Sequence, residues 1–143
     1  MNAFNYKIKK GKIKMRQTIR LASETLEGIK ILKQVYEKEF NGLKLNQGYV
    51  VSKAYIDTKA SLKNSHDWKK IIDAPLVLDS FNSTDESKES RTTLDLNDDV
   101  IDGIDKMKQV VPEIVSAKWV TIGFCIRLIV KAGLLKLKEE KRI

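Results

Sequence analysis

The chain has 143 residues, of which 42% are hydrophobic and 32% charged, and its net charge is +8. This composition fits one small globular domain or two very small ones and excludes a disordered chain, while the basic balance predicts a polyanionic partner. With one cysteine, no disulfide can form within the chain, and no apolar run opens the sequence as in a signal peptide, so we expect a cytoplasmic protein.

The first 15 residues form a basic arm with five lysines and no acidic residue. Either this arm follows the phosphate backbone of a nucleic acid or it is a disordered basic tail. The lysines that we expect to contact phosphates are Lys9, Lys10, Lys12 and Lys14. Peripheral membrane binding through the arm is a further alternative, but no membrane span is expected, because Arg127 and Lys131 interrupt the longest apolar stretch, 119–135.

An internal repeat dominates the rest of the chain. A constant offset of 75 aligns residues 16–58 with residues 91–133 without a gap, with nine identities over 43 positions. The repeats are separated by residues 59–90, so the predicted organisation is an arm (1–15), a first repeat (16–58), a linker (59–90), and a second repeat with a charged tail (91–143). The linker contains a possible short helix near residues 67–72, capped by Ser65, and a polar run, 80–90, that we expect to be flexible.

Each repeat opens with residues that alternate between apolar and polar, which predicts a strand with one buried face. The apolar face holds Ile19 and Leu21 in the first repeat and Leu94 and Leu96 in the second. The polar face holds, in the two repeats together, Arg16, Thr18, Arg20, Arg91, Thr93 and Asp95.

A first helix follows, with Ser23 or Asn97 as the predicted N-cap and acidic residues in its first turn. Its apolar stripe is centred on Ile29 in the first repeat and Ile104 in the second. Pro112 is predicted to end this helix in the second repeat.

A second helix begins after a short loop, with Asn46 and Thr121 as N-caps at matched positions. Gly48 and Gly123 fall in its first turn, where glycine lets the backbone approach a ligand closely. Cys125 in this helix is predicted to pack in the core, because a free cysteine behaves as a small hydrophobe. Trp119, just before the helix, is also predicted to lie in the core rather than to stack on a base.

Strand, helix and helix within about 45 residues cannot bury both helices alone, so the unit needs a partner. The two strand-to-helix junctions, 18–24 and 93–99, resemble those of the ribbon-helix-helix superfamily. The resemblance implies a mainly α fold with one two-stranded antiparallel β-ribbon, formed here as an intramolecular pseudo-dimer of two repeats. Two copies in one chain are similar to the tandem accessory proteins of some conjugation relaxosomes.

A two-stranded ribbon fits the major groove of B-DNA, so the polar face would meet base edges. The three arginines could donate to guanine, and the two threonines could hydrogen-bond bases or touch a thymine methyl group. Asp95 would accept from cytosine N4 or pair with a neighbouring arginine. The resemblance also implies phosphate binding at the start of the second helices. The residues expected there are Lys44, Asn46, Gln47, Gly48, Lys118, Thr121 and Gly123.

The expected function is therefore sequence-specific binding of double-stranded DNA, as a transcriptional repressor or plasmid-maintenance regulator. One alternative is a relaxosome accessory protein at a conjugative transfer origin, with a relaxase or a second copy as partner. A less favoured alternative is an antitoxin-like interaction protein. No constellation for catalysis, metal or cofactor binding is apparent, since His66 is the only histidine and no glycine-rich phosphate loop is present, so we do not expect an enzyme.

Overall fold

The computed structural model describes residues 15–74 and 89–143; the lysines of the predicted arm, Lys9, Lys10, Lys12 and Lys14, lie outside the described residues. The predicted fold class is confirmed: within the described ranges the chain is mainly helical, with one two-stranded antiparallel sheet. In chain order the elements are β1 (Met15–Ala22), α1 (Ser23–Glu39), α2 (Gln47–Thr58), the 3-10 turn η1 (Lys59–Ser61), α3 (Ser65–Asp73), β2 (Glu89–Leu96), α4 (Asp98–Ile114) and α5 (Ile122–Glu139).

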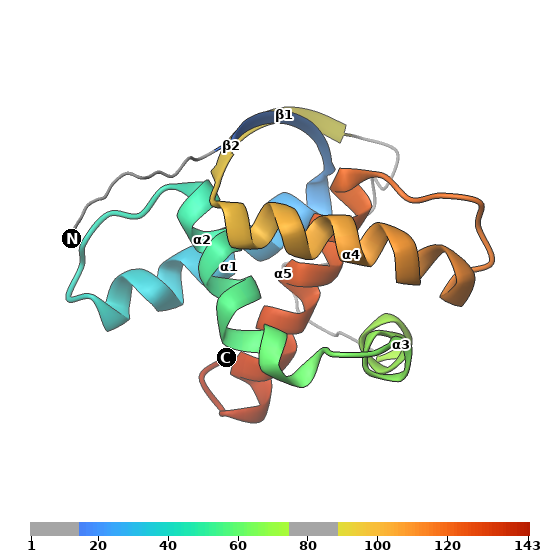
Figure 1. The fold of residues 1–143 in the computed structure, drawn as a ribbon. Helices are drawn as coiled ribbons and strands as arrows, with labels where there is room; N and C mark the ends of the chain where they lie inside the picture. The colour runs from blue at the N-terminus through green and yellow to red at the C-terminus, as the bar shows by residue number, and fades with distance from the viewer. Residues whose placement is uncertain (1–14, 75–88) are drawn as a thin grey trace, which may run out of the picture.

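The two strands form an arch on one side of the molecule, with the helices beneath it (Figure 1). β1 and β2 are antiparallel, and Thr18 lies opposite Thr93. Because the repeats are offset by 75 residues, this is the position at which each residue faces its own counterpart in the other repeat. An approximate two-fold axis therefore passes between the two threonines and relates the two strand-helix-helix units.

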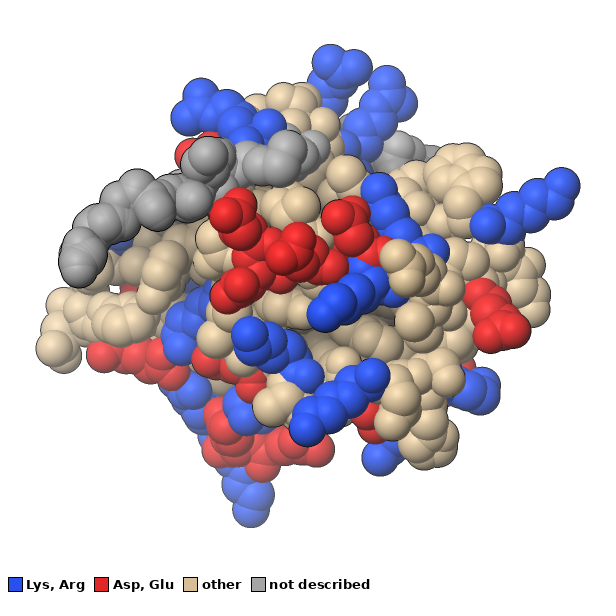
Figure 2. Space-filling model, viewed as in Figure 1, with Lys and Arg blue, Asp and Glu red and all other residues tan. Residues whose placement is uncertain are grey.

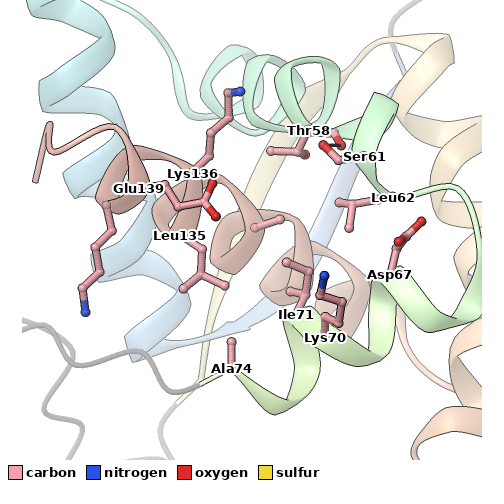
Figure 3. A pocket seen from close by; sticks show the side chains of 12 residues that line it. Thr58, Ser61, Leu62, Asp67, Lys70, Ile71, Ala74, Leu135, Lys136 and Glu139 are labelled. Atoms are coloured by element: carbon pink, nitrogen blue, oxygen red, sulfur yellow. Dashed lines mark hydrogen bonds between the residues drawn. The ribbon is translucent and has the colours of Figure 1, made fainter.

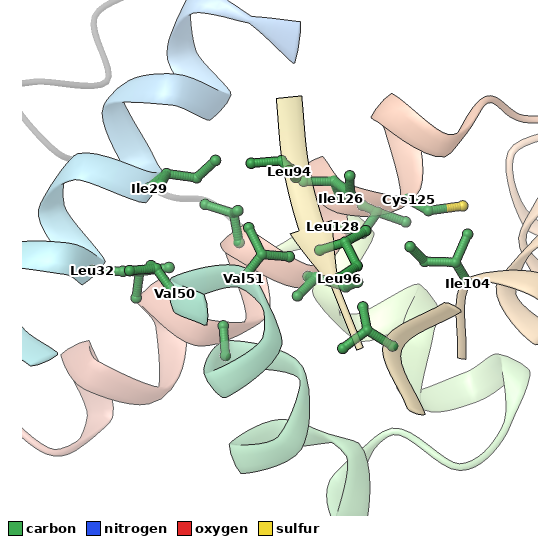
Figure 4. Close-up of a cluster of buried hydrophobic side chains, with 14 of the residues drawn as sticks. Ile29, Leu32, Val50, Val51, Leu94, Leu96, Ile104, Cys125, Ile126 and Leu128 are labelled. Atoms are coloured by element: carbon green, nitrogen blue, oxygen red, sulfur yellow. The ribbon is translucent and has the colours of Figure 1, made fainter. Parts of the chain in front are cut away.

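The inner face of the ribbon closes the hydrophobic core. Ile19, Leu21, Leu94 and Leu96 are all buried, as the period of two predicts. Figure 4 shows Leu94 and Leu96 beside the buried side chains of the second helices, α2 and α5, which include Val51, Cys125 and Ile126. The predicted core position of Cys125 is confirmed, and burial raises the pKa of its thiol to about 11, so that the thiol stays protonated at neutral pH.

Each second helix packs under the strand of the other repeat, and a glycine sets the distance. A Cβ at Gly48 would lie 2.8 Å from the backbone nitrogen of Asp95 and closer still to its carbonyl oxygen. A Cβ at Gly123 would lie 2.5 Å from the carbonyl oxygen of Arg20. The close approach that requires glycine at these positions is therefore to a strand of the other repeat, and phosphate binding by their backbone amides stays a prediction.

Three of the predicted caps are confirmed and two are wrong. The side chains of Asn46, Asn97 and Thr121 accept from the backbone amides of Tyr49, Val100 and Phe124, at 2.8, 3.1 and 3.0 Å. In α1 the N-cap is Ala22, without a side-chain cap, because Ser23 already has a helical position. In α3 the cap is Asn64 rather than Ser65, since Asn64 and Asp67 form a reciprocal capping box.

Pro112 does not end α4, which continues to Ile114. The missing amide of a proline removes one helical hydrogen bond, but the turn is held by its neighbours. Val111 is buried in the core and accepts from the amide of Val115 at 3.1 Å, and Pro112 itself accepts from Ala117 at 2.8 Å. Packing of Val111 thus extends the helix beyond the residue where local preference would end it.

The linker helix α3 is anchored to the second repeat. Trp68 is buried, and the Nζ atom of Lys131 on α5 donates to the carbonyl oxygen of Ile72 at 3.0 Å. Between α3, η1 and the end of α5 lies a hollow of about 450 Å³, whose walls include Leu62, Ile71 and Leu135 (Figure 3). None of the described helices is long and apolar enough to cross a membrane.

We predict that Gly48→Ala and Gly123→Ala each lower the free energy of unfolding by about 1–2 kcal/mol, because the added methyl group overpacks the contact between helix and strand more than the better helix propensity of alanine compensates. Urea denaturation measures this effect. Gln47→Ala is the matched control, since it adds no atoms toward the strand, and it should stay within about 0.5 kcal/mol of wild type. Glycine variants as stable as the control would contradict the packing described above.

Candidate nucleic-acid interface

The outer face of the ribbon brings together all six residues predicted to read bases. Five are exposed and Asp95 is half-buried, and the set is Arg16, Thr18, Arg20, Arg91, Thr93 and Asp95. These six side chains point away from the core, because the strand residues that alternate with them are buried in it. In Figure 2 basic side chains project from the top of the molecule, where Figure 1 places the ribbon.

The centre and one end of this face are linked by side-chain hydrogen bonds. The hydroxyl groups of Thr18 and Thr93 lie 3.3 Å apart across the approximate two-fold axis, and either can donate. At one end the Nε atom of Arg16 donates to Oδ1 of Asp95 at 3.1 Å. This hydrogen bond, together with the carboxylate charge, raises the pKa of Arg16 above its ordinary value. Of the two roles predicted for Asp95, pairing with a neighbouring arginine is the one that the structure displays.

The other end of the face carries two arginines that form no ion pair with any side chain that the structure describes. Arg20 lies directly opposite Arg91, and both are exposed. Guanidinium groups placed side by side in this way repel each other. Like charges opposite each other destabilise a pair of strands, so this end favours an anionic or hydrogen-bond-accepting ligand.

The residues predicted to bind phosphate lie at the starts of α2 and α5. Lys44 and Lys118 are exposed in the loops before these helices. In each helix the third backbone amide donates to the side chain of the N-cap, Asn46 or Thr121. The first two amides of a helix have no acceptor within the helix. Each start therefore offers free N–H groups, the positive end of a helix dipole and a lysine, which together suit an anion.

Two basic residues that the sequence did not reveal as site residues, Lys30 and Lys33, lie between the ribbon and the start of α2. They line a hollow of about 570 Å³ with Asn46, Gln47, Gly48, Thr93 and Asp95. Lys33 forms an ion pair with Glu37 at 3.0 Å, and Lys30, whose side chain is 66% exposed, forms a longer one with Glu27 at 3.9 Å. Because residues three apart lie on the same face of a helix, the sequence did indicate that the two lysines are neighbours. Comparison of the repeats did not point to them, since the counterpart of Lys30 is Asp105.

Trp119 was predicted to lie in the core, and that prediction was wrong: it is 70% exposed. It is found in the loop between α4 and α5, next to Lys118 and close to the cap of α5. Its counterpart in the first repeat is Lys44, which is also exposed. The indole therefore flanks one of the two candidate phosphate sites instead of filling the interior.

Acidic side chains limit the basic surface on one side. Figure 2 shows them gathered over α4, below the ribbon. The exposed carboxylates of this helix include Asp98, Asp99, Asp102 and Asp105. Because this surface would repel a polyanion, the outer face of the ribbon and the starts of α2 and α5 are the surface best suited to nucleic acid.

Comparisons with protein-family models, with curated proteins and with solved structures found no match. Among the described residues, no group of three or more histidine, cysteine or acidic side chains is arranged to hold a metal ion.

We predict that Trp119 and Trp68 differ in fluorescence, because Trp119 is 70% exposed and Trp68 only 5%. Trp119→Phe should remove the emission that acrylamide quenches, and Trp68→Phe, the matched control, should leave it. Loss of the quenchable emission in Trp68→Phe instead would contradict the exposed position of Trp119.

Proposed function

We propose that this protein binds double-stranded DNA in a sequence-specific manner, with the β-ribbon in the major groove, and acts as a transcriptional repressor or plasmid-maintenance regulator. The observation that carries the proposal is the outer face of the two-stranded ribbon, where Arg16, Arg20 and Arg91 lie beside two threonines. A ribbon of this kind has the width to enter the major groove, and arginine is the commonest partner of guanine there.

The phosphate contacts in this proposal come from the starts of α2 and α5. They lie beneath opposite strands and are related by the same approximate two-fold axis as the ribbon. A ribbon lying in the groove would have one helix start on each side, toward the two flanking backbones. Such contacts fix the register of a protein on a duplex, while the ribbon side chains supply the sequence preference.

We expect Arg20→Ala to weaken binding to a duplex enriched by selection from a random pool by about 1–3 kcal/mol, with little change for a scrambled duplex, because a lost base contact removes discrimination. Fluorescence anisotropy at one fixed salt concentration measures both affinities. Lys138→Ala is the control: Lys138 is exposed near the end of α5, on the side away from the ribbon, and its replacement should change neither affinity.

Lys44→Ala and Lys118→Ala should behave differently from Arg20→Ala. Because a phosphate contact carries no sequence information, each change should weaken both duplexes alike and reduce the slope of log affinity against log salt by about 1. A protein that selects no preferred sequence, or one whose Arg20→Ala variant keeps the wild-type preference, would overturn reading of bases by the ribbon.

A further inference from the structure

The two ends of the outer ribbon face are chemically different, although the backbone is nearly symmetric. Two identical strands in this register would place the same residue pair at both ends. Here one end has Arg16 opposite Asp95, and the other has Arg20 opposite Arg91. The difference arises at one position, because Asp95 stands where the second repeat would need an arginine to match Arg20.

The Arg16–Asp95 end offers both a donor and an acceptor. The Nε atom of Arg16 is taken by Oδ1 of Asp95 at 3.1 Å, which leaves the terminal guanidinium N–H groups of Arg16 and the second carboxylate oxygen of Asp95. The side chain of Arg16 is 75% exposed and that of Asp95 37% exposed, so both reach solvent on the outer face. A carboxylate in the major groove accepts from an exocyclic amino group and repels the O6 and N7 acceptors of guanine.

The Arg20–Arg91 pair itself offers only donors. Both guanidinium groups are exposed on neighbouring strands, with no ion pair in the described part of the chain to neutralise them. Guanine presents two acceptors in the major groove, the geometry that an arginine fork matches. Guanine contacts would also relieve the repulsion between the two arginines.

We propose that the target is a polar, non-palindromic duplex and that Asp95 determines its polarity. Guanines lie under the Arg20–Arg91 end, and a base pair that presents an amino group lies under the Arg16–Asp95 end, where Asp95 excludes guanine from the position it faces. The protein then binds its site in one orientation. This inference rests on the proposed function, since it assigns the base preference of the same ribbon.

The decisive variant is Asp95→Arg. It gives the second repeat the arginine that the first repeat has at the matching position, Arg20, and so makes the two ends alike. Selection from a random duplex pool should return a site without two-fold symmetry for the wild-type protein. For the variant it should return an inverted repeat, with guanine at both ends. In direct binding, the variant should prefer the symmetric duplex over the wild-type site by at least about fivefold, the lower limit for one good arginine–guanine contact.

Asp95→Asn is the matched control, because it keeps the shape of the side chain, removes its charge and replaces one acceptor oxygen with an amino donor. It should lose the discrimination against guanine at the Arg16–Asp95 end and keep the preference at the Arg20–Arg91 end. Urea denaturation of each variant verifies that the fold is intact, and if Asp95→Arg does not fold, the loss of discrimination in Asp95→Asn tests the same role of Asp95.

The outcomes separate the inference from the proposed function. A palindromic site selected by the wild-type protein, or equal guanine preference at both ends, would overturn the polarity while leaving sequence-specific DNA binding intact. Unchanged discrimination in Asp95→Asn would overturn the role of Asp95. A wild-type protein that binds all duplexes equally, or none, would overturn the proposed function and the inference together.

Discussion

The antiparallel pairing of β1 with β2 is the contact on which the rest of the molecule depends. It joins segments whose central residues, Thr18 and Thr93, are 75 positions apart, and it presents one apolar face to the core and one polar face to solvent. Each strand also receives the second helix of the other repeat, at Gly48 and Gly123. Neither repeat therefore has a complete core of its own, and the pairing that closes the core also builds the polar face that we propose reads DNA.

Covalent fusion of the repeats permits differences that two identical chains could not have. Arg16 pairs with Asp95 at one end of the ribbon, while Arg20 faces Arg91 at the other. The same divergence reaches the interior, where Glu24 at the start of α1 forms an ion pair with Arg127 of α5. The counterparts of these two residues are Asp99 and Ser52, which cannot form such a pair. Symmetry is thus kept in the backbone and lost in the charges.

Much of the fold could be predicted from the sequence, because its signals are local. The alternation of apolar and polar residues located both strands. Three helix starts were marked by the capping residues Asn46, Asn97 and Thr121, and the offset of 75 related the two units. The errors arose where tertiary packing decides: burial of Val111 carries α4 past Pro112, and Trp119 is exposed because its loop lies outside the core. Of the candidate interface, the ribbon face was predictable from periodicity, whereas which arginine pairs with Asp95 followed only from the cross-strand register.

Methylation interference on a selected duplex tests the central claim most directly, because it shows which groove the protein reads. The N7 atom of guanine lies in the major groove, and the N3 atom of adenine lies in the minor groove. With the ribbon in the major groove, methyl groups on guanine N7 within the site should block binding, and methyl groups on adenine N3 should be tolerated. Interference by adenine N3 methylation alone would contradict the account.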